Sequence, residues 1–332
     1  MAFLNIHKGK KHVLIVIFSL VFFTTTLKIE AQPDSLFFIQ PEVPIVPIWL
    51  QVNEAGMFIN QVSFTNWNAG GVNSISAVLY AKARAKYKQD GMFWNTTLSG
   101  RYGINKQQGE MLRKTDDIVE LKSNFGYRNS EESNWFYSAR FNFSTQFSNG
   151  FNYPNTDRPI SRFMAPGYLF FGAGIEYGKN IETMSLYMSP LTMKTTFVLD
   201  DELSNAGSFG VDPAIYDMEG NIIRRGSSTR KELGILLTNA FETELFENIQ
   251  FNNLLSLYTD YLNRFGNVDI DWEINFNFVV NNYVKASLGS HIRYDNDVKN
   301  KVTIAQTNEV TVEEGAKLQW KQLLGIGVQV DF

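Results

Sequence analysis

Apolar and polar residues alternate with a period of two along most of this chain, a pattern typical of β-strands that have two different environments. In the segment that begins at Trp135, apolar side chains occupy the odd positions to Phe143 and polar side chains the even positions from Ser138 to Gln146. Residues 268–278 repeat the order, with Asp, Glu and Asn between apolar residues. A soluble β-sandwich would rarely keep its outer face so aromatic. The alternation therefore favours a barrel with a polar interior and a lipid-facing exterior.

About twelve such segments follow one another, and an even number is expected of single-chain bacterial barrels. They lie near residues 56–66, 72–88, 92–104, 114–128, 134–147, 167–179, 182–198, 229–244, 246–262, 268–280, 282–295 and 318–332. We therefore predict an all-β fold, a transmembrane up-and-down antiparallel β-barrel of about 12 strands.

The connections between these segments fall into two classes that alternate along the chain. The first class is short, at 89–91, 129–133, 180–181, 245 and 281. The second class contains the longest connections, at 67–71, 105–113, 148–166, 199–228, 263–267 and 296–317. Outer-membrane barrels have short periplasmic turns and long extracellular loops, so a periplasmic N-terminus fits this segregation. Asp90-Gly91 should form a two-residue type I′ turn that sets Lys86 opposite Asn95 and Arg84 opposite Thr97.

The N-terminal region has the features of a secretory signal. Three lysines up to Lys11 precede an apolar run that is too short to span a membrane, and Ala31 completes a small-residue cleavage pattern. We predict a removed signal over residues 1–31, a proline-rich extended lead over 32–55 and a barrel over 56–332. The mature chain should begin at or near Gln32, which mass spectrometry of outer-membrane material can check.

The composition excludes several classes of site. Cysteine is absent, so there are no disulfides, thiolate metal ligands or lipid-modified cysteines. Removal of the signal leaves 26 basic and 33 acidic residues, a net charge of −7, which argues against a nucleic-acid partner. His291 would be the one remaining histidine, and it offers few ways to build a zinc site or a catalytic triad. We predict no catalytic residues, no metal and no cofactor.

Several short motifs occur in one order along the chain. They are N-Q-V-S-F-T-N-W-N-A-G-G-V-N-S (Asn60 to Ser74), W-N (Trp94-Asn95), R-K-T-D-D (Arg113 to Asp117), F-G-Y-R (Phe125 to Arg128), S-T-Q-F (Ser144 to Phe147), S-R-F-M-A-P-G-Y (Ser161 to Tyr168), S-P-L-T-M-K-T-T-F-V (Ser189 to Val198), D-W-E (Asp271 to Glu273) and Y-D-N-D-V (Tyr294 to Val298). With these motifs the chain resembles a Bacteroidota family catalogued as domain of unknown function 3078, over nearly all of the mature protein. The resemblance implies a barrel-like outer-membrane protein without an assigned activity or known functional residues.

Two groups of charged residues are predicted to face the lumen. Lys82, Arg84 and Lys86 share the polar face of the second segment. This basic stripe would either select anions or pair with acids inside the barrel.

The second group lies on the tenth and eleventh segments, where Asp269, Asp271 and Glu273 face a return strand with His291 and Arg293. Two registers are compatible with the spacing: Asp271 lies opposite either His291 or Arg293, and acids meet bases in both. This cluster should occupy the extracellular half of the lumen.

Two acidic motifs lie near segment ends, at Asp116-Asp117 and Asp295-Asn296-Asp297. They lack the glycine and distal glutamate of a calcium loop, so we interpret them as solvated rim charges, with a divalent-cation site as the alternative.

A twelve-stranded barrel is wider than barrels whose interior is filled by side chains and narrower than porins with open channels. This width favours a small pore or solute-translocating barrel in the outer membrane. The alternatives are a structural or partner-binding barrel that acts through its outer loops, and an outer-membrane lipid hydrolase. The hydrolase is disfavoured because His291 has luminal parity. Expected partners are outer-membrane lipid and the barrel insertion machinery, which would read the final strand ending at Phe332, after export through the Sec pathway.

Overall fold

The computed structural model describes residues 49–332, apart from 65–70, 263–264, 297–298 and 305–309. The predicted signal and most of the predicted lead lie outside the described residues. No helix in the described ranges is long and apolar enough to span a membrane.

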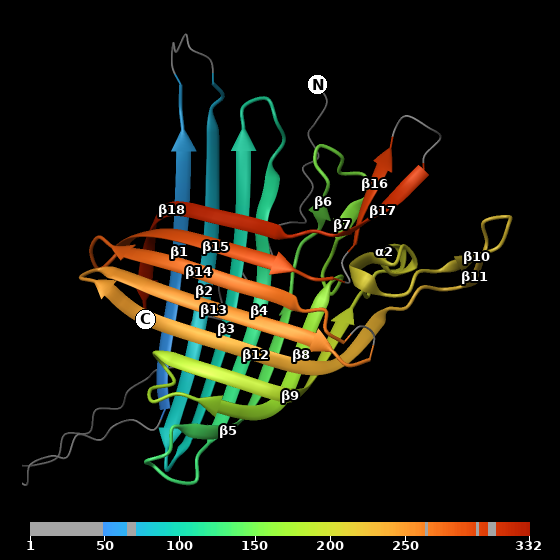
Figure 1. Ribbon diagram of the computed structural model, residues 1–332. Helices are drawn as coiled ribbons and strands as arrows, with labels where there is room; N and C mark the ends of the chain where they lie inside the picture. Colours follow the sequence, from blue (N-terminus) through green and yellow to red (C-terminus); the bar gives the residue numbers. More distant parts are fainter. Residues whose placement is uncertain (1–48, 65–70, 263–264, 297–298, 305–309) are drawn as a thin grey trace, which may run out of the picture. The chain divides into compact units, whose positions relative to one another are not determined.

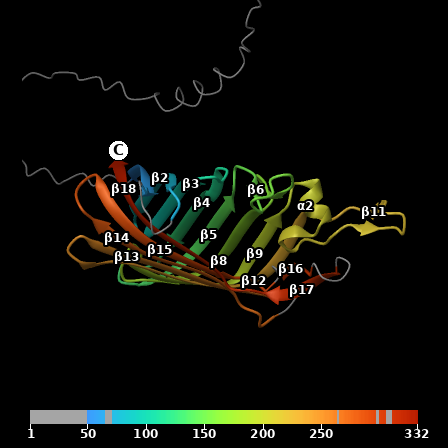
Figure 2. The same ribbon diagram turned by 90° about the horizontal axis from the view of Figure 1, so that it is seen from above.

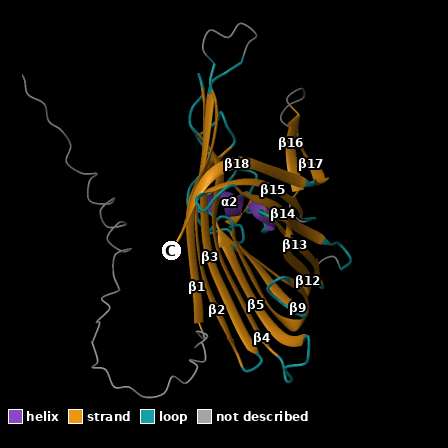
Figure 3. Ribbon diagram, turned by 90° about the vertical axis from the view of Figure 1, so that its left-hand side faces the viewer, coloured by secondary structure: helices purple, strands orange, loops and turns teal. Residues whose placement is uncertain are grey.

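Twelve strands close into one antiparallel barrel (Figures 1 and 3). They are β1 (Trp49–Val62), β2 (Ser74–Gln89), β3 (Met92–Gln107), β4 (Arg113–Tyr127), β5 (Trp135–Thr145), β8 (Gly167–Tyr177), β9 (Met184–Phe197), β12 (Thr229–Phe246), β13 (Ile249–Asp260), β14 (Asp269–Val279), β15 (Val284–Tyr294) and β18 (Gln319–Asp331). Each pairs with the barrel strands before and after it in the chain, and β18 closes against β1. The predicted up-and-down topology is confirmed.

Short and long connections lie at opposite ends of the barrel strands, as predicted. The short set is 90–91, 128–134, 178–183, 247–248 and 280–283, and the other set is 63–73, 108–112, 146–166, 198–228, 261–268 and 295–318. Because β1 starts and β18 ends among the short turns, both ends of the barrel chain lie on that side.

The three longest connections carry small elements of their own, which Figure 2 shows beyond the barrel strands. These elements are β6 (Gly150–Phe151), β7 (Pro159–Ser161), α2 (Asp201–Asn205), η1 (Ser208–Gly210), β10 (Ile215–Tyr216), β11 (Ile222–Arg224), β16 (Lys299–Ile304) and β17 (Val310–Ala316). A small apolar core of Ala165, Val198, Leu203 and Val211, with Phe209 against it, joins the 146–166 and 198–228 connections.

The register of the first hairpin is the predicted one. Arg84 lies opposite Thr97 and Lys86 opposite Asn95. The turn residues Asp90 and Gly91 have φ values of 49° and 77°. Positive φ at both central residues is what a type I′ turn requires, and the glycine adopts it without a steric penalty.

The first strand differs from its predicted bounds, because β1 begins at Trp49 rather than at residue 56 and ends at Val62 rather than at 66. Proline cannot donate a ladder hydrogen bond, and the strand starts two residues after Pro47. Because Gly56 has no side chain, it interrupts the alternation, and the sequence pattern did not show that the strand continues before it. A Cβ there would lie 2.6 Å from the Tyr80 ring, so the missing side chain makes room for that aromatic residue.

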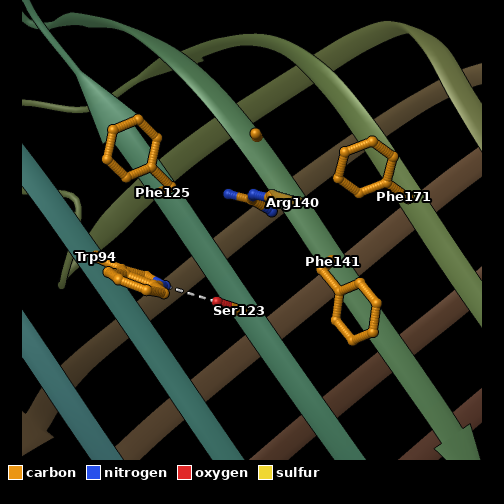
Figure 4. Close-up of a pocket in the computed structure, with 7 residues that line it drawn as sticks. Trp94, Ser123, Phe125, Arg140, Phe141 and Phe171 are labelled. Atoms are coloured by element: carbon orange, nitrogen blue, oxygen red, sulfur yellow. Dashed lines mark hydrogen bonds between the residues drawn. The ribbon is translucent and has the colours of Figure 1, made fainter.

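The barrel's outward face is apolar. Leu79, Leu98 and Leu324 are more than half exposed on it, at 55, 51 and 65%, whereas Val78 and Phe93 on the inward face are buried. Figure 4 shows part of the outward face, where Trp94, Phe125, Phe141 and Phe171 surround a shallow pocket. The alternation in the sequence thus separates an apolar exterior from a polar interior.

Candidate functional site

The basic stripe on β2 is neutralised by acids. Glu54 on β1 lies 3.6 Å from Lys82 and 3.2 Å from Arg84. Lys86 reaches Glu182 in the 178–183 turn on the far side of the barrel, at 3.0 Å. The geometry matches the interpretation in which these cations pair with acids, in the half of the lumen near the short turns.

The predicted acid–base cluster on β14 and β15 forms in the other half of the lumen. Asp271 lies opposite Arg293 and Glu273 opposite His291, which is the second of the two predicted registers. The Asp271 carboxylate contacts both bases, with 2.9 Å from Oδ1 to His291 Nε2 and 3.2 Å from Oδ2 to Arg293 Nε. Acids and bases meet here as predicted, because luminal residues are odd-numbered on both strands.

Asp269, in contrast, does not pair with a base on β15. Its carboxylate lies 2.9 Å from Lys194 of β9, which also contacts Asp295 at 3.3 Å and Glu232 at 3.5 Å. Sequence reasoning missed this hub. A bulge in β9 reverses the alternation, so that Lys194 turns inward. Pro190, which cannot continue a regular ladder, was the available signal.

The two acidic motifs are not solvated rim charges, so that interpretation is wrong. Asp116 lies between Arg101 at 3.0 Å and Lys321 at 2.8 Å, and its side chain is 9% exposed. Asp117 is bound by Lys114 and accepts hydrogen bonds from Ser148. Residue 297 of the second motif lies outside the described residues. Asp116 is a cross-strand partner because the barrel brings Arg101 and Lys321 to it, whereas Asp117 pairs with Lys114 of its own strand.

A second buried pair, also missed from the sequence, joins β5 to β8. Glu176 is 1% exposed and lies 2.7 Å from Arg140, and it accepts further hydrogen bonds from Ser138 and Asn124. The Arg140 guanidinium lies 4.2 Å from the centre of the Tyr187 ring. Several donors around one carboxylate compensate its loss of water.

Contacts between strands that are not neighbours narrow the lumen. Phe170 of β8 packs edge-on against Tyr258 of β13, with 6.0 Å between ring centres. The Arg293 guanidinium lies 5.7 Å from the centre of the Tyr168 ring across the barrel. These contacts lie in the half of the lumen near the long connections.

The luminal charges differ in their access to water. Three on β8, β9 and β12 are buried: Lys194, Glu232 and Glu176 are 6, 2 and 1% exposed. Five charged side chains on β3, β4, β14, β15 and β18 are between 37 and 45% exposed, and we call them the accessible lane. They are Arg101, Lys122, Asp271, Arg293 and Lys321. Water therefore reaches some of the luminal charges and not others.

Comparison with known proteins gives a family match and a set of structural likenesses. Residues 59–151 match the protein family of unknown function DUF3078. That match covers less than half of the chain and not the later motifs. No curated protein matches.

Among solved structures, the COG4313 outer membrane channel from Pseudomonas putida F1 has 11% identity and a TM-score of 0.38, over 89% of this chain and 100% of the channel. The translocator domain of the autotransporter NalP from Neisseria meningitidis has 10% identity and a TM-score of 0.32, over 84 and 87%. The TodX monoaromatic hydrocarbon channel has 9% identity and a TM-score of 0.28, over 85 and 88%. At this level, the chain is similar to these proteins in fold alone.

Proposed function

We propose that the protein is an outer-membrane barrel that passes small ions or polar solutes along the accessible lane of its lumen. The observation that carries the proposal is the unequal hydration of the luminal charges. Buried charges on β8, β9 and β12 tie strands together, whereas the accessible lane holds charges that water reaches. In a pore, rings or rows of charged side chains set selectivity.

The hydrogen bonding of the outward tryptophans supports the membrane location. Each of three indole N–H groups donates to a polar side chain on a neighbouring strand instead of relying on water. Trp94 donates to Ser123 at 2.8 Å (Figure 4), Trp320 to Ser290 at 2.9 Å and Trp272 to Asn253 at 2.8 Å. A surface in contact with water does not need such pairing, but a surface in hydrocarbon does.

Outward aromatic residues gather near both strand ends, which also supports a membrane location. Near the short turns they are Trp49, Tyr87, Trp94, Tyr127, Trp135 and Tyr177, and near the long connections Tyr102, Phe147, Tyr261 and Trp320. Aromatic girdles of this kind mark the two membrane interfaces of outer-membrane barrels. The short turns would then face the periplasm and the long connections the outside. Export through Sec, outer-membrane lipid as surroundings and recognition of β18 by the insertion machinery belong to this proposal.

The test is single-channel conductance in a planar bilayer. Asp271 and Arg293 lie in the accessible lane with opposite charges, so Asp271→Ala should shift selectivity toward anions and Arg293→Ala toward cations. The exposed pair Asp201 and Arg225, outside the barrel wall at 3.2 Å, offers matched controls of the same charge types. Asp201→Ala and Arg225→Ala should leave selectivity unchanged. A folded wild-type barrel without channels, or the same ion selectivity in all four variants, would refute the proposal.

One observation favours the partner-binding alternative. The β10–β11 hairpin projects from the barrel (Figure 2) and exposes Met218 fully and Ile223 at 68%. If the protein acts by binding a partner, deleting this hairpin should abolish that binding. If it acts as a pore, the deletion should leave conductance intact. The lipid hydrolase gains no support, since His291 bonds Asp271 inside the lumen, away from the lipid-facing surface.

A further inference from the structure

Asp271, Glu273 and His291 form a compact group of ligand atoms in the lumen. One side-chain oxygen or nitrogen from each residue lies within 4.8 Å of the others. In the described part of the chain this is the one group of three or more His, Cys, Asp or Glu residues with that geometry. The register fixes it, because Glu273 is directly opposite His291 and Asp271 is one luminal position away.

The three side chains differ in their partners, and the difference leaves one carboxylate able to take a ligand. Asp271 is oriented by Arg293, which holds Oδ2 and leaves Oδ1 toward His291 Nε2. Glu273 makes no hydrogen bond or ion pair with any residue that the structure describes. Its one described interaction with a base is the electrostatic attraction of Lys122, without direct contact. A luminal carboxylate left over beside an imidazole and a second carboxylate is a suitable position for a cation.

We propose that Asp271, Glu273 and His291 bind a divalent transition-metal ion, with Zn²⁺ as the representative. An imidazole nitrogen with two carboxylate oxygens suits Zn²⁺, whereas Mg²⁺ and Ca²⁺ prefer oxygen ligands alone. The ion replaces the proton between His291 Nε2 and Asp271 Oδ1, and water completes the coordination. Arg293 acts as the outer partner that orients the Asp271 carboxylate, as groups behind metal ligands commonly do.

The local charge and the access route are compatible with this site. The two carboxylates carry more negative charge than Arg293 neutralises, and Lys122 is bound by Glu120 at 2.7 Å. Asp271 and His291 are 45 and 29% exposed, so an ion in the accessible lane reaches them. The composition-based expectation of no metal counted cysteines and histidines and left out the carboxylates that strand pairing adds. The proposal goes beyond the proposed function, because binding needs a hydrated lumen but no conduction.

The experiment is calorimetric titration of the purified full-length mature protein, folded in detergent, with Zn²⁺ and separately with Mg²⁺. We expect one Zn²⁺ per barrel and much weaker Mg²⁺ binding. His291→Gln and Glu273→Gln should each weaken Zn²⁺ binding by at least about tenfold, which is what even an outer partner of a metal ligand is typically worth. Glu242→Gln, which removes a carboxylate of β12 outside the group, is the matched control and should bind as the wild type does.

X-ray absorption at the zinc edge gives an independent readout, with one imidazole and otherwise oxygen ligands expected. Circular dichroism and heat-modified gel migration establish that each variant is folded. Zn²⁺ affinity that is unchanged in both His291→Gln and Glu273→Gln overturns the site. If Zn²⁺ binds but no channels form, the metal site is supported and the pore is refuted. If channels form but Zn²⁺ does not bind, the pore is supported and the metal site is refuted.

Discussion

Replacing Lys194 with methionine should be among the most destabilising single changes in this barrel. Lys194 is almost fully buried and lies within 3.5 Å of Glu232, Asp269 and Asp295, which come from three different parts of the barrel. Methionine keeps the length of the side chain but removes a charge that all three carboxylates share. Removing one partner of a buried ion pair costs about 3–5 kcal/mol. Because three acids lose a partner together, we expect the upper end of that range, about 5 kcal/mol or roughly four thousandfold in the unfolding equilibrium.

The assay is urea unfolding of the protein in lipid vesicles, followed by tryptophan fluorescence. Lys231→Met removes an exposed lysine of the same strand as Glu232 and should change stability by less than about 0.5 kcal/mol. Adding Asp269→Asn to Lys194→Met should recover part of the loss, since one carboxylate fewer then lacks the ammonium, so the two changes should be non-additive. A loss below about 1 kcal/mol for Lys194→Met would show that water or neighbouring bases replace the ammonium, and the hub would not hold the strands together.

Two further predictions use the same unfolding assay. Glu176→Ala leaves the buried Arg140 without its carboxylate and should cost about 3–5 kcal/mol, whereas Glu182→Ala removes the exposed partner of Lys86 and should cost at most about 1 kcal/mol; equal effects would contradict the distinction between dry and wet pairs. Gly91→Ala forces a side chain into left-handed backbone and should cost about 1–2 kcal/mol. Gly100→Ala, where a Cβ would have 3.9 Å of clearance, is the control and should be neutral, and a tolerated Gly91→Ala would speak against the type I′ turn.

The sequence predicted most of the fold because a barrel strand repeats one simple pattern. Alternation located all twelve strands, and the Asp90-Gly91 turn fixed a whole register through Lys86 and Arg84. Prediction failed where a local irregularity intervened: at Gly56, which interrupts the luminal face of β1, and at the β9 bulge, which turns Lys194 inward.

The candidate site was predictable only between strands that are neighbours in the chain. Asp271 and Arg293 belong to one hairpin, so parity and turn length limited their register to two choices. Lys194 with Asp269, or Asp116 with Lys321, meet only after the sheet has curled and closed. Such contacts depend on the stagger of the whole barrel, which no single segment of the sequence contains.

The joint between the first and last strands has a mechanical consequence. Strand β1 pairs with β2 from Trp49 to Val62, but with β18 only from Glu54 to Ile59. In the described part of the chain, β18 is therefore bonded on one side only from Gln319 to Gly325, where it pairs with β15. The joint that closes the barrel is thus incomplete on the side of the long connections. Backbone amides along this stretch should exchange their hydrogens before those of Ile326 to Val328, which pair on both sides. If the barrel opens sideways to admit a neighbouring strand, we expect it to open at this closing joint.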